Sequence, residues 1–179
     1  SQREVGVHSP NFADALHSAL REDPDVILVG EMRDLETISI AVTAAEMGIL
    51  VMGTLHTNGA AQTVDRIINS FPADKQAHIR TMISTSLRGV ISQQLLPTIH
   101  RPGRAAALEI MINTSAVSNL IRQGKLDQLE TAIQSGGNIG MKSMDSALME
   151  LVEKGWVSGE EAYLQANNKA QFEKVKEIE

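Results

Sequence analysis

The sequence contains no cysteine, and only 3% of its residues are aromatic. The absence of cysteine excludes disulfide bonds and any metal site built on thiolates. Because aromatic residues are so scarce, the hydrophobic core must be aliphatic, formed by Ala, Ile, Leu, Val and the eight methionines. A chain of 179 residues is long enough to bury such a core as one domain, with room for a small appended region.

Long apolar runs are also missing. No stretch approaches the roughly 20 residues that a membrane-spanning helix needs, and the polar N-terminus has no segment typical of a signal peptide. The net charge of −6 argues against nucleic acid or an anionic membrane as the main partner. We therefore expect a cytoplasmic protein with no nucleic-acid partner and no direct membrane insertion. Because the first residue is not methionine, we expect a fragment or a processed or trimmed form.

The most informative stretch is residues 25–34. Four apolar residues at 26–29 run directly into Gly30 and then Glu31. A continuous apolar run predicts a strand that is buried on both faces, as in a parallel sheet. Ligands of such sheets bind beyond the carboxyl ends of the strands, which is where Glu31 falls. The alternative interpretation is a buried strand that ends in a solvated turn.

A second apolar strand is predicted at residues 49–52, and the polar segment after it contains His56. Asp34 is expected to cap a helix that joins the two strands. A strand, a helix and a strand within about thirty residues favour a right-handed crossover between parallel strands. Glu31 and His56 should then meet at one edge of the sheet.

The remaining pattern is mainly helical. Ser9 is expected to cap a first helix that begins at Pro10, and Thr57 or Asn58 a third one. An amphipathic helix is predicted over residues 74–93. The other predicted elements are a strand at 105–112, with an edge position as one alternative, and helices at 115–123, 126–134, 143–154 and 158–167.

A strand-end carboxylate beside a polar loop is typical of one half of a nucleotide-hydrolysing site. The carboxylate holds Mg²⁺ or its water, and a neighbouring side chain senses the terminal phosphate. The phosphate-binding half is missing, because no Gly-x-x-x-x-Gly-Lys-Ser/Thr motif occurs and the glycine-rich residues 136–140 lack both the lysine and a preceding strand. We expect the chain alone to bind nucleotide poorly or not at all.

Three motifs also resemble a known family. Residues 26–36, VILVGEMRDLE, resemble the atypical Walker B segment of the type II/IV secretion ATPase superfamily, and residues 53–58, GTLHTN, resemble its His box. Residues 116–123 are similar to the AIRNLIRE signature of the PilT-like pilus retraction ATPases, with departures at Ser118 and Gln123. These departures leave a PilU-like paralogue open.

The resemblance implies an α/β fold with a partial RecA-like P-loop NTPase core, mostly parallel, in residues 1–113. A helical C-terminal region with the AIRNLIRE-like helix would follow in residues 114–179. It further implies a homo-hexamer that hydrolyses ATP with Mg²⁺ to power type IV pilus retraction, located in the cytoplasm at an inner-membrane platform protein. The Walker A loop, and an Asp box that supplies the general base, would precede Ser1.

The resemblance also assigns roles. Glu31 would be the Walker B carboxylate that coordinates Mg²⁺ or its water, and His56 would report the phosphate state to the subunit interface. Arg33, Asp34 and Thr57 are weaker candidates for contacts with the cofactor. The AIRNLIRE-like helix would be a mechanical element, whose residues Val117, Leu120 and Ile121 dock on the core while Asn119 and Arg122 point outward. Its motif residues are Ala116, Asn119, Leu120, Ile121 and Arg122.

Other interpretations remain open. Glu31 alone is equally typical of an exposed acid at a strand end, and His56 of a histidine satisfied within a loop. The histidines at 56, 78 and 100 lack the close spacing of a metal site. The chain as a whole fits a non-catalytic assembly module of the pilus machinery as an alternative. An extension or secretion ATPase is disfavoured, because those relatives commonly carry a tetracysteine zinc insert.

Overall fold

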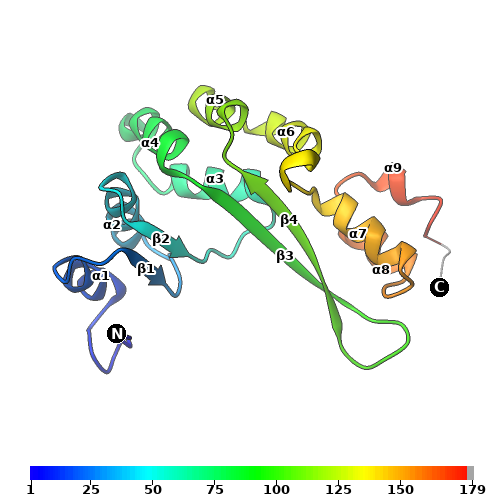
Figure 1. The fold of residues 1–179 in the computed structure, drawn as a ribbon, viewed down its shortest axis with the longest axis horizontal. Coiled ribbons are helices and arrows are strands. Elements are labelled where there is room, and N and C mark those ends of the chain that lie inside the picture. The colour runs from blue at the N-terminus through cyan, green and yellow to red at the C-terminus, as the bar shows by residue number, and fades with distance from the viewer. Residues whose placement is uncertain (177–179) are drawn as a thin grey trace.

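The computed structural model describes residues 1–176, and Figure 1 shows the chain running from α1 and the parallel strand pair to the helices at the C-terminal end. In chain order the elements are α1 (Phe12–Leu20), β1 (Val26–Val29), α2 (Leu35–Glu46), β2 (Leu50–Gly53), α3 (Ala60–Asn69), α4 (Ala73–Ser86), β3 (Gly89–Pro97), β4 (Arg104–Ile112), α5 (Ser115–Gln123), α6 (Leu129–Ser135), α7 (Met144–Glu153), α8 (Gly159–Gln165) and α9 (Lys169–Phe172). Within residues 1–176, each helix is too short or too polar to cross a bilayer.

The predicted strand–helix–strand unit is confirmed. Strands β1 and β2 pair in parallel, in a register that runs from Val26 opposite Leu50 to Val29 opposite Gly53. Helix α2 joins them and begins, as predicted, at Asp34, whose side chain accepts a hydrogen bond from the backbone N–H of Thr37. This cap fixes where the polar turn after β1 ends and the helix starts.

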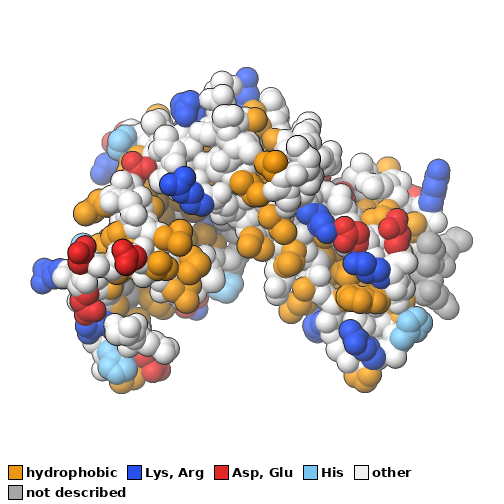
Figure 2. All heavy atoms as spheres, viewed as in Figure 1, with side chains coloured by type: hydrophobic (Ala, Val, Ile, Leu, Met, Phe, Trp, Pro, Cys, Tyr) orange, Lys and Arg blue, Asp and Glu red, His pale blue; other side chains and the backbone are white. Residues whose placement is uncertain are grey.

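The prediction that β1 is buried on both faces was wrong. Ile27 and Val29 are buried against α1 and α2, but Leu28 is 70% exposed and Val26 is 50% exposed. Burial alternates because the two helices cover only one face of the pair, and no element within residues 1–176 covers the other. Leu50 and Met52 of β2 are exposed as well. Figure 2 shows hydrophobic side chains gathered where these two strands lie.

The amphipathic helix predicted over residues 74–93 was also wrong in its second half. Helix α4 ends at Ser86, and the chain continues as β3, which pairs antiparallel with β4 from Gly89 opposite Ile112 to Pro97 opposite Arg104. Val90 is buried and Ile91 is exposed, so burial follows the strand period of two. Pairing along the whole length of β4 decides the conformation here, and the helical spacing of the apolar residues was coincidental.

Two of the predicted helix starts also differ. Helix α1 is capped by Asn11, whose side chain accepts from the backbone N–H of Asp14 at 2.7 Å, rather than by Ser9. Helix α3 starts after Gly59, and neither Thr57 nor Asn58 caps it. Gly59 has a φ of +97°, a conformation open mainly to glycine, so the chain turns into α3 without a local side-chain cap.

The C-terminal helices follow the predictions closely. Ser143 caps α7 and Ser158 caps α8, each by accepting a hydrogen bond at the helix start. The segment predicted as one helix over 126–134 is divided into a 3₁₀ turn at Leu126–Gln128 and α6. From residue 114 onward the described chain is therefore helical, as expected.

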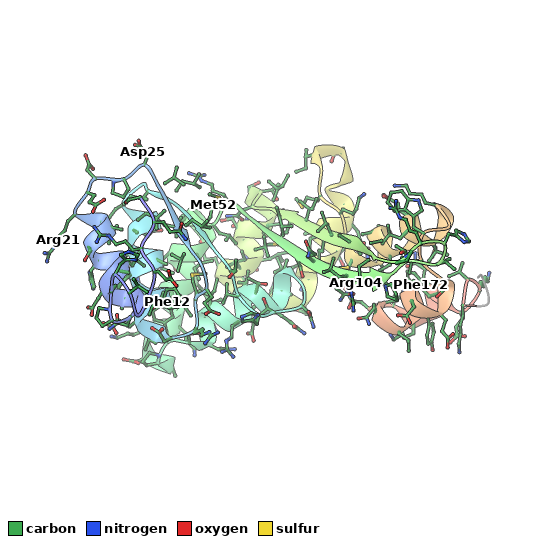
Figure 3. The ribbon with its side chains drawn as sticks, turned by 90° about the horizontal axis from the view of Figure 1, so that it is seen from below. Phe12, Arg21, Asp25, Met52, Arg104 and Phe172 are labelled. Carbon is green, nitrogen blue, oxygen red and sulfur yellow. The ribbon has the colours of Figure 1, made fainter. Side chains whose placement is uncertain are left out.

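Within residues 1–176, the buried hydrophobic residues form three clusters along the molecule. One joins α1, β1 and α2, a second joins α3 to α6 with one end of the β3–β4 hairpin, and a third joins the other end of the hairpin with α7, α8 and α9. Figure 3 shows this elongated arrangement, with Arg21 toward one end and Phe172 toward the other. The second cluster contains Met111 and Val117, so it includes residues from both sides of the predicted domain boundary at 113, which stays a prediction.

Candidate functional site

Glu31 and His56 meet at the carboxyl ends of the two parallel strands, as predicted. The Oε2 atom of Glu31 lies 3.3 Å from Nε2 of His56. The pairing of the strands continues beyond their ends, because the N–H of Met32 donates to the carbonyl of Thr54 at 2.9 Å. Thr54 also donates its hydroxyl to the carbonyl of Gly30. These backbone contacts hold the two turns together and place the carboxylate beside the imidazole.

Arg33 completes the cluster. Its Nε lies 2.7 Å from Oε2 of Glu31, whose side chain is 23% exposed. The Arg33 guanidinium lowers the pKa of Glu31, partial burial opposes this, and the hydrogen bond with His56 lowers the pKa further. The net effect is a pKa below the ordinary value of a glutamate, so the carboxylate is charged at neutral pH.

The carboxylate of Glu31 fits a role as a single ligand of Mg²⁺. Both contacts described above engage Oε2, which leaves Oε1 without a hydrogen-bond partner within residues 1–176. Mg²⁺ is commonly held by one or two carboxylates together with substrate phosphates and water. No group of three His, Cys, Asp or Glu side chains in the described chain could hold a metal ion by itself. A cation at Glu31 therefore needs ligands from elsewhere, such as nucleotide phosphates.

Asp34 and Thr57 have structural partners. The two carboxylate oxygens of Asp34 accept from the backbone N–H of Thr37 at 2.8 Å and from its hydroxyl at 3.1 Å. The hydroxyl of Thr57, in the turn before α3, lies 2.8 Å from the hydroxyl of Thr63, in the first turn of that helix. Asp34 therefore caps α2, and Thr57 links its turn to α3. Contacts of either residue with a cofactor stay predictions.

The AIRNLIRE-like helix is α5, and it docks as predicted. Val117 and Ile121 are completely buried, and Leu120 packs against the same cluster. Asn119 and Arg122 are exposed and hydrogen-bonded to each other at 3.0 Å. Ala116 is also exposed.

Ser118, the first departure from the signature, donates its hydroxyl to the carbonyl of Ser84 near the end of α4, at 2.6 Å. The second departure, Gln123, is the last residue of α5 and is exposed.

Sequence reasoning missed Glu109. This residue lies in β4, is 5% exposed, and accepts hydrogen bonds from the backbone of Ala60 and of Met144. It is the single charged residue of the apolar run 105–112, and that isolation was the available signal. The two segments that it joins could not be read from the sequence.

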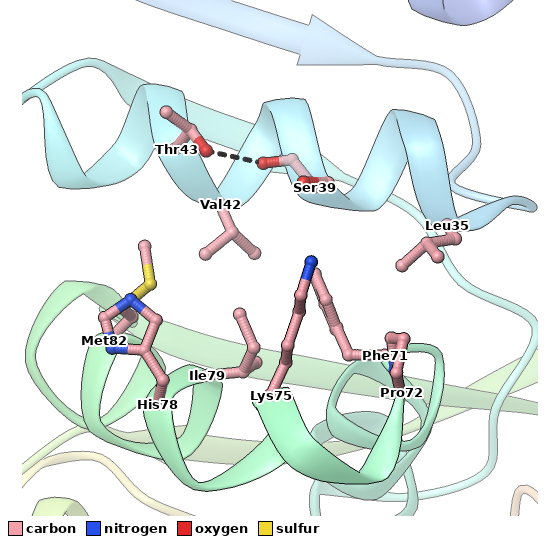
Figure 4. A pocket seen from close by; sticks show the side chains of 10 residues that line it. All are labelled: Leu35, Ser39, Val42, Thr43, Phe71, Pro72, Lys75, His78, Ile79 and Met82. Atoms are coloured by element: carbon pink, nitrogen blue, oxygen red, sulfur yellow. Dashed lines mark hydrogen bonds between the residues drawn. The ribbon is translucent and has the colours of Figure 1, made fainter.

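A groove of about 300 Å³ lies between α2 and α4, and none of the predicted site residues lines it. Figure 4 shows Val42 and Ile79 facing each other across the groove, with the side chain of Lys75 reaching into it. Thr43 donates its hydroxyl to the carbonyl of Ser39 on the α2 side. The Glu31–His56 pair is thus an open strand-end site and not part of this hollow.

Comparison with known proteins gives the family. The family model described as Type II/IV secretion system protein matches residues 6–115. The type IV pilus retractation ATPase PilT of Pseudomonas aeruginosa is 57% identical over 90% of this chain and 47% of its own length. A twitching motility protein of Neisseria gonorrhoeae is 55% identical over 94% of this chain and 45% of its own.

A solved structure shows the same fold. The crystal structure of the pilus retraction motor PilT with bound ADP superposes with a TM-score of 0.88 at 46% identity, covering 97% of this chain and 49% of that one. The predicted α/β class, with a partial RecA-like core and a helical C-terminal region, is thereby confirmed. The chain spans about half the length of the curated relatives it matches. It belongs to the type II/IV secretion system protein family.

Proposed function

We propose that this chain is the Walker B and His box portion of a motor ATPase that hydrolyses ATP to power type IV pilus retraction. The observation that carries the proposal is the contact between Glu31 and His56 at the ends of adjacent parallel strands. The 57% identity to a protein named as a pilus retractation ATPase supports the direction of the motor. In the full-length protein the site would be completed by a phosphate-binding loop.

Each residue of the strand-end cluster has a distinct task in this proposal. Glu31 would hold Mg²⁺, directly or through water, because its Oε1 has no hydrogen-bond partner within residues 1–176. A cation held there would supply positive charge toward the transferred phosphoryl group. Arg33 orients the carboxylate and favours its ionised form. His56, which contacts the same carboxylate, relays a change at the nucleotide into the turn before α3.

The proposed assembly is a closed hexameric ring in the cytoplasm, docked on an inner-membrane platform protein. In a ring of identical subunits, each site can combine residues of one chain with residues of its neighbour. The exposed apolar face of β1 and β2 supports a further part of this proposal. We assign it as the surface that the rest of the ATPase core covers in the full-length protein, because apolar faces of this kind are rarely left in water.

The test is ATP turnover of the full-length protein with Glu31→Gln, and with His56→Ala. We expect Glu31→Gln to lower turnover at least about 100-fold, because a neutral amide is a poor ligand for Mg²⁺. Glu160→Gln is the matched control, since Glu160 is an exposed acid in the first turn of α8, outside the three motifs, and should retain full turnover. Wild-type turnover in Glu31→Gln would refute the role given to Glu31.

Extension or secretion of substrates is the second candidate. Residues 98–103 alone connect β3 to β4. By the family resemblance, extension and secretion relatives commonly carry a tetracysteine zinc insert before this strand, and its absence here supports retraction. The presence of pili on the surface of cells that lack the gene distinguishes the two functions. Deleting a retraction motor leaves pili assembled on cells that do not twitch, whereas deleting an extension motor leaves cells without pili.

A non-catalytic assembly module is the third candidate, motivated by the absence of a phosphate-binding loop in this sequence. Calorimetry of the polypeptide 1–179 with ATP and Mg²⁺ separates it from an autonomous enzyme. Micromolar binding would exclude the module. The absence of binding, together with turnover by the full-length protein, agrees with the motor proposal.

A further inference from the structure

Glu109 is a buried carboxylate that joins two helix starts from distant parts of the chain. Its Oε1 accepts from the backbone N–H of Ala60 at 2.7 Å, at the start of α3. Its Oε2 accepts from the backbone N–H of Met144 at 3.2 Å, at the start of α7. Helix N-termini carry unpaired N–H groups and a positive dipole end, so one carboxylate satisfies and stabilises both. We call these two hydrogen bonds the Glu109 bridge.

The first partner of the bridge is the turn that follows the His box. Helix α3 has no side-chain cap of its own, and Glu109 supplies the missing acceptor from β4. Ser92 of β3 accepts from the N–H of Gly59 at 2.8 Å, directly beside it. The turn that carries His56 is therefore anchored at its far end to the β3–β4 hairpin, in addition to its contact with α3 through the hydroxyls of Thr57 and Thr63.

The second partner belongs to the C-terminal helices. Backbone hydrogen bonds between Ile110 and Lys142, of 2.8 and 3.0 Å, bring the chain before α7 alongside β4. Met144 then presents its N–H to Glu109. The same side chain thus contacts the segment after the His box and the start of the helical region whose helices pack on the far end of the hairpin.

We propose that Glu109 is a positioning residue that couples the His-box turn to the C-terminal helices. The kinetic part of this inference rests on the proposed ATPase, whereas the structural part does not. A change in the turn at His56 alters the start of α3, and the Glu109 bridge carries that change to the start of α7. In the opposite direction, a load on the C-terminal helices reaches the His-box turn.

Asp145 provides a matched control within the same structure. It is 3% exposed, and its two oxygens accept from the backbone N–H groups of Asn167 and Asn168 at 2.8 and 2.9 Å. It therefore has the same chemistry, burial and number of bonds as Glu109. Within residues 1–176, both hydrogen-bond partners of its carboxylate belong to the C-terminal region and neither belongs to the His-box turn.

The experiment compares Glu109→Gln and Asp145→Asn in the full-length protein by hydrogen–deuterium exchange and by steady-state ATP hydrolysis. In Glu109→Gln one oxygen is replaced by a donor and the negative charge is lost. We expect exchange at least about threefold faster in residues 57–64 and 141–150. We also expect kcat to fall at least about threefold with the KM for ATP within twofold, because Glu109 does not touch the nucleotide.

Asp145→Asn should increase exchange only in residues 141–150 and 165–170 and leave kcat unchanged. Glu109→Asp, which keeps the charge but is too short to reach both helices, should fall between wild type and Glu109→Gln. Wild-type exchange at 57–64 in Glu109→Gln, or equal effects of Asp145→Asn there, would overturn the coupling. An exchange result as expected in a protein without ATPase activity would refute the proposed function and leave the coupling intact.

Discussion

The carboxylate of Glu31 lies 2.7 Å from the guanidinium Nε of Arg33, two positions further along the chain. The turn after β1 folds the arginine back onto the acid. The hydrogen bond from Arg33 has the largest effect on the pKa of Glu31, and it depends only on residues of the same turn.

Arg33→Ala should therefore raise the pKa of Glu31 toward its ordinary value. Because the pKa of Glu31 is lower in the folded than in the unfolded protein, the stabilisation from its charge is present above the unfolded pKa and is lost as the pH falls through the folded one. Carbon-13 NMR titration of the Glu31 carboxyl measures the change. His56→Ala should move the pKa in the same direction but less, and an unchanged midpoint in Arg33→Ala would contradict the assignment.

Leu28→Asp tests the exposed face of β1. Leu28 is 70% exposed here, and a substitution at such a surface position normally changes the free energy of unfolding by no more than about 0.5 kcal/mol. If the rest of the ATPase core covers this face, the same change buries an unpaired charge and costs about 3 kcal/mol or more. Denaturant unfolding of the full-length protein measures the cost. Leu164→Asp, at an exposed position of α8, is the control, and a small effect of both substitutions would refute the covered face.

Ile121→Ala and Arg122→Ala should separate packing from mechanics in α5. Ile121 is completely buried, so its truncation should cost about 2–5 kcal/mol of stability. Arg122 is exposed, and its removal should change stability by less than about 0.5 kcal/mol. If α5 is a mechanical element, Arg122→Ala should keep ATP turnover and lose twitching. Loss of turnover in this variant would instead place Arg122 in the hydrolysis reaction.

Glu130→Gln should stabilise the protein at neutral pH. Burial raises the pKa of Glu130, and the negative charges of Asp145 and Glu109 raise it further. A carboxyl whose folded pKa is raised favours folding below its unfolded pKa and loses that contribution as the pH rises through the folded pKa. The neutral glutamine should gain a few tenths of a kcal/mol at pH 7. Thermal unfolding at pH 7 and pH 4 measures this, and the gain should vanish at pH 4.

The sequence predicted the parts of the fold that local signals determine. The apolar residues 26–29, the cap at Asp34 and the predicted strand at 49–52 together indicate a crossover between parallel strands. The meeting of Glu31 and His56 followed from that strand order. The helices predicted at 143–154 and 158–167 were equally local, because each begins at a serine whose side chain accepts a hydrogen bond within the first turn. In each case the deciding contacts lie within a few residues of the pattern that predicted them.

The errors arose where distant contacts decide the structure. Val90 and Ile91 fit a helix by spacing, but pairing with β4 makes them part of a strand. The N–H of Ala60 at the start of α3 donates to Glu109, 49 residues further along the chain. No local sequence motif predicts this contact. The exposure of Leu28 depends on which elements cover β1. Information of this kind is held in the tertiary arrangement and not in the periodicity of a segment.

The β3–β4 hairpin is a continuous two-stranded connection between two parts of the molecule. Its strands are hydrogen-bonded from Gly89 to Pro97, and its two ends belong to different hydrophobic clusters. A two-stranded ribbon resists stretching along its length far more than loops do. A small displacement of α7 and α8 along the axis of the hairpin should therefore reach its opposite end, at α3 and α5, with little loss.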